Sequence, residues 1–283
     1  MYNIGNVETW GHLQNKAAEQ GLPLEIMTAE IMHLAALDVL FSGQDSALLC
    51  FQGGTSIHLL HGGYRYSEDL DFAGKKLAPS SAEKLVKRSQ SSIEKAITQI
   101  LGSGRFEWRF PKKKPNPRVF TTWVLFQPPP FRNKYRLKLE FGHFAVHEPN
   151  FYPIRSDLDL LGKRTLVSGL TPRELLVEKT IAVFGRPYLK GRDFFDIWYL
   201  HHILQVPLDT HLLHGKLKDY REHPPVKSIQ RKLAGLTPSF IKAEMDRFLP
   251  QAHRAKLKKN GYRDILATSL SVLDKALDSC EAG

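Results

Sequence analysis

The chain has 283 residues, of which 42% are hydrophobic and 24% are charged, fractions that exclude a fibrous or wholly disordered protein. Its 40 Lys and Arg residues against 29 Asp and Glu residues give a formal net charge of +11, which favours a polyanionic partner such as nucleic acid. Two cysteines cannot supply a disulfide framework, and we identify no secretory signal and no stretch apolar enough to span a membrane. We therefore expect a cytoplasmic protein.

The hydrophobic pattern divides the chain into three parts. Residues 1–46 carry apolar side chains at helical intervals and predict a helical N-terminal cap. Residues 47–166 mix short apolar runs with alternating ones, which is typical of an α/β core with a mixed sheet. Residues 167–283 read as further helices. The fold class is therefore predicted to be α+β, with an α/β core followed by a helical C-terminal half.

Local signals place individual elements within this plan. We expect strands in four segments: 47–51, 67–72, 119–126 and 135–141. Ser80 to Glu83 forms a capping box, which predicts a helix that runs to about Leu101. Thr171 is followed by Pro and, three residues after the Thr, by Glu, which predicts another helix start at that point. A further helix is expected after Gly191.

The segment Gly53-Gly54-Thr55 lies between a predicted strand and a predicted helix. Two glycines let backbone N–H groups approach a phosphate closely, and the N-terminus of a helix favours negative charge. The hydroxyl of Thr55 or Ser56 could donate to a phosphate oxygen. These residues predict a phosphate-binding turn.

Two aspartates follow on the next predicted strand. Ser67, Asp69 and Asp71 occupy alternate positions, so we expect their side chains on one face, with Arg65 in the same register. Neighbouring carboxylates repel each other unless a divalent cation lies between them, and Mg²⁺ prefers hard oxygen ligands and substrate phosphates. The pattern predicts a metal–triphosphate site; the alternative is an exposed strand with two solvated aspartates after an ordinary turn.

Glu140 lies on the strand predicted over residues 135–141, on the face opposite the apolar side chains. There it could be the third carboxylate of a two-metal site, the group that deprotonates or orients an attacking hydroxyl. The alternative is an ion pair with a Lys or Arg, and the sequence does not decide between the two.

The C-terminal half carries a second polar cluster. Lys179 has apolar neighbours three and four residues away on either side, so its ammonium must reach an anion or extend to solvent. Asp193 and Asp196 share one face of the next helix. An ion pair between Asp196 and Arg192, four residues earlier, is the simpler alternative for the aspartates.

Basic and aromatic residues alternate in segment 105–114, and Arg132, Lys134, Arg136 and Lys138 follow. Cations bind phosphates and aromatic rings stack on unpaired bases, so the segment could bind RNA. The alternative is a solvated turn whose aromatic side chains face the core.

The two polar blocks together resemble those of a known family. Segment 53–55, a helix, and then Tyr-Arg-Tyr-Ser-Glu-Asp-Leu-Asp-Phe at 64–72 are similar to the signature of AbiEii-type (MenT-like) nucleotidyltransferase toxins, within the DNA polymerase β-like nucleotidyltransferase superfamily. Lys179, Arg186 and Arg-Asp-Phe-Phe-Asp at 192–196 match the second block in order. The resemblance spans about residues 50–200, and here Thr55 stands where the superfamily has Ser.

The resemblance implies an enzyme that transfers NMP from an NTP to an acceptor hydroxyl with release of pyrophosphate. It implies Mg²⁺ or Mn²⁺ as cofactor, held by Asp69 and Asp71 with Glu140 as candidate third ligand. It further implies nucleotide contacts from the following residues: Gly53, Gly54, Thr55, Arg65, Ser67 and Lys179. One of Asp193 and Asp196 would support the site.

Family resemblance together with the positive charge makes the 3′ end of tRNA the favoured acceptor, in a toxin neutralised by a cognate antitoxin. Two alternatives stay open at this point. One is a basic RNA-binding protein whose transferase site is vestigial, and the other is a nucleotidyltransferase that modifies a protein or a small molecule.

Overall fold

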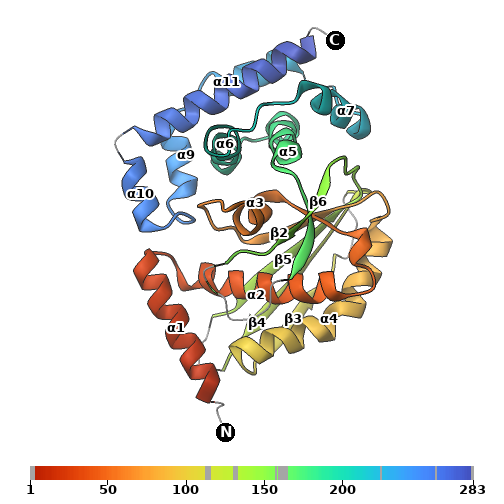
Figure 1. Ribbon diagram of the computed structural model, residues 1–283, viewed down its shortest axis with the longest axis vertical. Coiled ribbons are helices and arrows are strands. Elements are labelled where there is room, and N and C mark those ends of the chain that lie inside the picture. The colour runs from red at the N-terminus through yellow and green to blue at the C-terminus, as the bar shows by residue number, and fades with distance from the viewer. Residues whose placement is uncertain are drawn as a thin grey trace. The chain divides into compact units, whose positions relative to one another are not determined.

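A computed structural model describes residues 4–111, 116–129, 133–156, 158, 165–223, 225–258 and 260–281 (Figure 1). The chain forms two compact units. Unit 1 comprises residues 1–62 and 66–169, and unit 2 comprises residues 63–65 and 170–283. None of the described helices combines the length and the apolar character needed to cross a bilayer.

Unit 1 is built on a mixed sheet. Its helices are α1 (Ile4–Gln20), α2 (Leu24–Ser42), α3 (Gly53–His61) and α4 (Pro79–Leu101). Its strands are β1 (Cys50–Gln52), β2 (Asp69–Ala73), β3 (Arg105–Arg109), β4 (Val119–Gln127), β5 (Tyr135–Gly142), β6 (Pro149–Pro153) and β7 (Leu166–Leu170). The strand order is β3-β4-β5-β2-β1-β7-β6, and β2 pairs in parallel with β5 but antiparallel with β1. Helices and a mixed sheet confirm the predicted α+β class.

The two faces of β2 and β5 differ in chemistry because successive side chains point to opposite sides of a strand. On one face Phe72 stacks on Phe141 of β5, with ring centroids 5.0 Å apart, and lies 6.2 Å from Phe41 of α2. Helices α2 and α4 lie side by side against this apolar face (Figure 1). The other face of the same two strands carries the charged residues.

Unit 2 is helical in its described part. Its elements are α5 (Pro172–Gly185), α6 (Gly191–Trp198), a π-helical turn (Tyr199–Ile203), α7 (Thr210–Tyr220), α8 (Val226–Leu233), α9 (Pro238–Met245), α10 (Gln251–Leu257) and α11 (Gly261–Glu281). The predicted start of α5 is confirmed, since the Thr171 hydroxyl accepts the N–H of Glu174 at 3.3 Å. Helix α6 begins at Gly191 as expected and is buried at every position except Arg192.

Some sequence predictions differ from the structure. Strand β2 begins at Asp69, so Ser67 lies ahead of the strand and not on its face as predicted. Helix α4 begins at Pro79, before the predicted capping box, and Glu83 pairs with Lys87 at 2.9 Å. Proline at the first helical position is preorganised for the helix, which explains the earlier start. Strands β3, β6 and β7 were not predicted.

Candidate active site

The turn at Gly53 places a helix N-terminus beside a carboxylate. Gln52, the last residue of β1, pairs with Asp71 of β2, and α3 begins at the next residue, Gly53. Gly53 has φ of +79°, and a Cβ atom built on it would lie 2.2 Å from Oδ2 of Asp71. Only glycine therefore allows the backbone to pass so close to this carboxylate.

We expect Gly53→Ala to abolish the nucleotidyl transfer that the family resemblance implies, because the methyl group must displace the Asp71 carboxylate. The positive φ adds about 1–2 kcal/mol of backbone strain. Transfer activity and thermal unfolding measure the two effects. Gly11→Ala is the matched control, since Gly11 lies inside α1, a methyl group added there would meet nothing within 4 Å, and alanine should be tolerated. A Gly53→Ala variant as active as the wild type would refute the assigned geometry.

The hydroxyl groups after this turn are used within the protein. Thr55 is 1% exposed and its hydroxyl donates to the carbonyl oxygen of Asp69 at 2.5 Å. The hydroxyl of Ser56 donates to the carbonyl oxygen of Gly53 at 2.9 Å. Thr55 thus fixes the backbone of β2 at Asp69, and the groups that the turn offers an anion are backbone N–H groups.

The charged face of β2 and β5 brings together three predicted site residues, Asp69, Asp71 and Glu140, and one further residue, Lys138. Asp69 is paired in register with Lys138, and Asp71 with Glu140. The ammonium of Lys138 lies 2.9 Å from Oε2 of Glu140 and 3.4 Å from Oδ2 of Asp69. These carboxylates raise the pKa of Lys138 despite its partial burial. The side chain of Asp69 is 31% exposed and that of Asp71 is half-buried, so solvent reaches both aspartates.

The side chains on this face differ in whether their oxygen atoms could bind a divalent cation. Asp69 and Asp71 are two hard oxygen donors on one strand face, beside a backbone turn suited to phosphate, and this donor set fits Mg²⁺ with its remaining ligands from substrate and water. Glu140 is engaged by Lys138 and accepts from Thr121 at 3.4 Å. In the described part of the chain, no group of three or more His, Cys, Asp or Glu side chains could hold a metal ion. The alternative expected for Glu140, an ion pair with a lysine, is thus present, while its role as third ligand stays a prediction.

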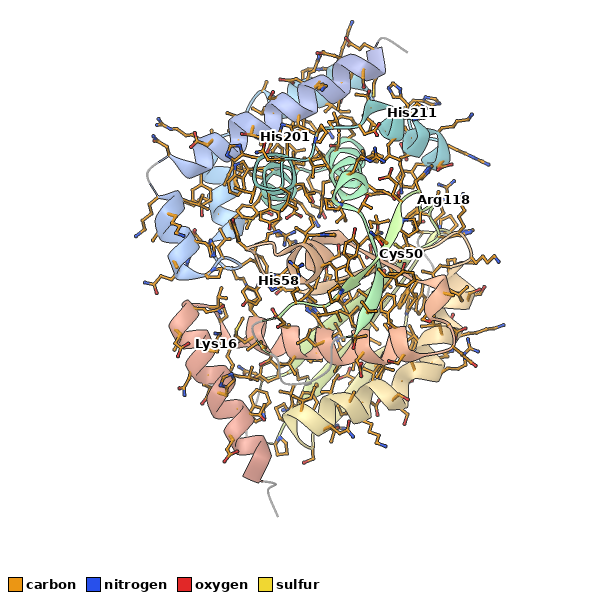
Figure 2. All side chains as sticks on the ribbon, in the orientation of Figure 1. Lys16, Cys50, His58, Arg118, His201 and His211 are labelled. Carbon is orange, nitrogen blue, oxygen red and sulfur yellow. The ribbon has the colours of Figure 1, made fainter. Side chains whose placement is uncertain are left out.

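A buried polar cluster next to β2 was not predicted from the sequence. The Nε2 atom of His33, in α2, lies 3.2 Å from the carbonyl oxygen of Glu68. Burial lowers the pKa of His33. His58 of α3, labelled in Figure 2, lies 3.1 Å from Oε2 of Glu30, whose other carboxylate oxygen accepts from Ser156. Polar residues three apart inside an otherwise apolar helix, Glu30 and His33, were the available signal. His33 and Thr55 thereby hold consecutive carbonyl groups at the start of β2.

Unit 2 contains the second predicted block as a buried ion-pair network. Lys179 of α5 lies 2.7 Å from Oδ2 of Asp196 and 3.4 Å from Oδ1 of Asp193. Arg65 donates to both carboxylate oxygens of Asp196, at 2.6 and 2.5 Å. Arg186 pairs with Asp193. The network brings together Lys179, Arg186, Asp193 and Asp196 but not Arg192. It also includes Arg65, which the resemblance had placed with the nucleotide-binding residues.

Electrostatics within this network follow from burial and pairing. Burial lowers the pKa of Lys179, and the neighbouring cations Arg65 and Arg186 act in the same direction. Burial alone would raise the pKa of Asp196, but Arg65 and Lys179 more than offset it, so the pKa is lowered. Arg192, the alternative partner of Asp196, lies instead 3.8 Å from Glu244.

The basic and aromatic segment is only partly described, since Lys112 to Lys114 and Arg132 lie outside the described residues. Trp108 donates through its indole nitrogen to Glu94 of α4 at 2.7 Å. The ring centroids of Phe106 and Phe126 are 4.8 Å apart. These rings are half-buried and contact the rest of unit 1. The segment is not the solvated turn of the alternative interpretation, since Arg105–Arg109 forms strand β3. Its aromatic side chains do contact the core, as that alternative expected.

Comparison with known proteins identifies the class. The family model described as "Nucleotidyl transferase AbiEii toxin, Type IV TA system" matches residues 36–280. Because this model covers most of the chain, it identifies the protein as a nucleotidyltransferase. The chain belongs to the AbiEii nucleotidyltransferase toxin family, whose toxins act in type IV toxin–antitoxin systems and so imply an antitoxin and an NTP substrate.

Solved structures support the fold. The protein is similar to JHP933 from Helicobacter pylori, with a TM-score of 0.54 and 18% identity over 92% of this chain and 97% of that chain. A second H. pylori protein, provisionally described as a nucleotidyltransferase, gives a TM-score of 0.50 and 17% identity over 91% of this chain and 98% of that chain. No protein with a curated description matches the chain.

Proposed function

We propose that the protein transfers NMP from an NTP to the 3′ hydroxyl of tRNA, with Asp69 and Asp71 holding a divalent cation, Mg²⁺ or Mn²⁺. The observation that carries the proposal is the charged face of β2, which carries both aspartates and places Asp71 beside Gly53. When bound, the cation supplies neutralisation of charge on the triphosphate. A tRNA acceptor is supported by the family's toxins and by the net charge of +11, since a blocked 3′ end stops translation.

The residues of unit 1 have distinct parts in this reaction. The N–H groups at the start of α3 bind and orient the triphosphate, and Ser67 is a further candidate contact. The acceptor oxygen forms a bond to the α-phosphorus, the bond from that phosphorus to the bridging oxygen breaks, and pyrophosphate leaves. Glu140, on the same face, is the candidate to take the proton of the acceptor hydroxyl or to orient that hydroxyl. Contact of Lys179 with nucleotide phosphates and support of the site by Asp193 or Asp196 stay predictions.

The test incubates the purified chain with Mg²⁺, total tRNA and each of the four NTPs, labelled at the α-phosphate. We expect RNA to acquire label from at least one NTP and to acquire none when EDTA removes the metal. Periodate-oxidised tRNA, which lacks an intact 3′ terminal diol, is the matched control and should stay unlabelled.

The outcomes separate the alternatives. Label on a protein or a small molecule, with none on RNA, would replace tRNA by that acceptor. Binding of tRNA without any transfer, in all four NTPs, would favour an RNA-binding protein with an inactive site and would refute the proposed reaction.

A further inference from the structure

Lys138 is a cation placed among the carboxylates of the candidate site. It lies on β5 directly across from Asp69, and its neighbour two residues along, Glu140, lies across from Asp71. Its ammonium contacts both Glu140, at 2.9 Å, and Asp69, at 3.4 Å. The side chain is 23% exposed, against 48% for Lys134, which makes a surface ion pair with Glu107. Lys138 is thus more enclosed by its acidic partners than an ordinary surface lysine.

The charges of this face suit a single divalent ion. Three carboxylates and one ammonium leave two formal negative charges on Asp69, Asp71, Glu140 and Lys138, which one divalent cation neutralises. A second divalent cation would have to lie near Glu140, where the ammonium already is. Two cations in contact with the same carboxylate repel each other strongly, so the ammonium and a second divalent cation exclude one another at Glu140.

We propose that the ammonium of Lys138 takes the place of a second divalent cation, so that the free protein binds one such ion through Asp69 and Asp71. The inference rests on the proposed function, because it presumes a cation at those two aspartates. Lys138 acts as a positioning residue that keeps Glu140 in place and unavailable as a metal ligand, in place of the third-ligand role that the resemblance implied for Glu140. A lysine ammonium suits this role because it is a compact point charge with three donors.

Removal of the ammonium should therefore open a second metal site. In Lys138→Met the charge is lost, the length of the side chain is kept, and Glu140 is released as a donor. The number of Mn²⁺ ions bound per chain is counted by titration of the full-length protein with Mn²⁺ alone, with free Mn²⁺ followed by electron paramagnetic resonance. We expect one ion in the wild type and two in Lys138→Met.

Three further proteins sharpen the measurement. Arg136→Met removes a positive charge from the exposed residue on the same face of β5 and should still bind one ion. Lys138→Met combined with Glu140→Gln should return to one ion, because the released donor is gone. Lys138→Gln serves in place of Lys138→Met if the latter does not unfold cooperatively.

The results distinguish this inference from the proposed function. Equal numbers of ions in the wild type and the Lys138 variants would overturn the inference about Lys138. If the ion numbers are equal but Asp71→Asn loses Mn²⁺ binding, the proposed metal site at Asp69 and Asp71 still stands and only the inference about Lys138 fails. If Asp71→Asn binds Mn²⁺ as the wild type does, the proposed metal site fails, and the inference fails with it.

Discussion

Asp71→Asn is expected to lower the rate of nucleotidyl transfer by at least about 10³-fold, since a loss of some 4 kcal/mol of transition-state stabilisation has that effect. The substitution keeps the shape of the side chain but removes the charge beside Gly53. Without that charge the protein has one carboxylate of the pair left to hold a divalent cation. Single-turnover transfer of α-labelled NMP to RNA measures the change.

Asp45→Asn is the matched control for this substitution. Asp45 is in the same unit, is partly exposed, and pairs with Arg88 at 2.6 Å, well apart in sequence from the charged face. Its transfer rate should stay within about twofold of the wild type, because surface substitutions away from such sites have small effects. Wild-type activity in Asp71→Asn, with an unchanged melting temperature, would show that the carboxylate has no part in the reaction.

Asp196→Ala is expected to destabilise the protein by about 3–5 kcal/mol, which is the usual cost of removing one partner from a buried ion pair. Asp196 is 1% exposed, and its loss leaves Arg65 and Lys179 buried without the carboxylate that both contact. Urea unfolding followed by circular dichroism measures the loss. Asp274→Ala, on the exposed side of α11, should change stability by less than about 0.5 kcal/mol.

The lowered pKa of Asp196 also predicts how the stability of the protein depends on pH. Its pKa in the folded protein is lowered from the ordinary value of 3.8, so the carboxylate stabilises the folded state above about pH 4. That contribution is lost as the pH falls through the lower, folded-state pKa. The wild type should therefore lose more stability than Asp196→Ala between about pH 5 and about pH 2. Parallel acid profiles for the two proteins would contradict an ionised Asp196 in the folded state.

The sequence predicted the local features that depend on nearby residues. The start of α5 at Thr171 follows from a hydroxyl cap and a proline, both of which act within one turn. The shared face of Asp69 and Asp71 follows from the alternation of a strand. The position of Ser67 could not be predicted in the same way, because the alternation says nothing about where the strand begins.

Features that depend on distant residues were beyond such reasoning. Arg65 is four residues from Asp69, yet it belongs to unit 2 and donates two hydrogen bonds to Asp196, 131 residues further along. Lys138 lies across from Asp69 only because β2 and β5 pair in parallel in that register. No single segment carries either partnership, so the network around Asp196 and the enclosed ammonium at Glu140 needed the folded chain.

The location of a bound cation tests the central claim most directly. Wild-type crystals soaked with Mn²⁺ and an NTP would show the ion by its anomalous scattering. We predict a peak coordinated by the carboxylates of Asp69 and Asp71, with the triphosphate against the backbone of residues 53–55. A well-occupied nucleotide with its Mn²⁺ bound elsewhere, and none at these two side chains, would contradict the account.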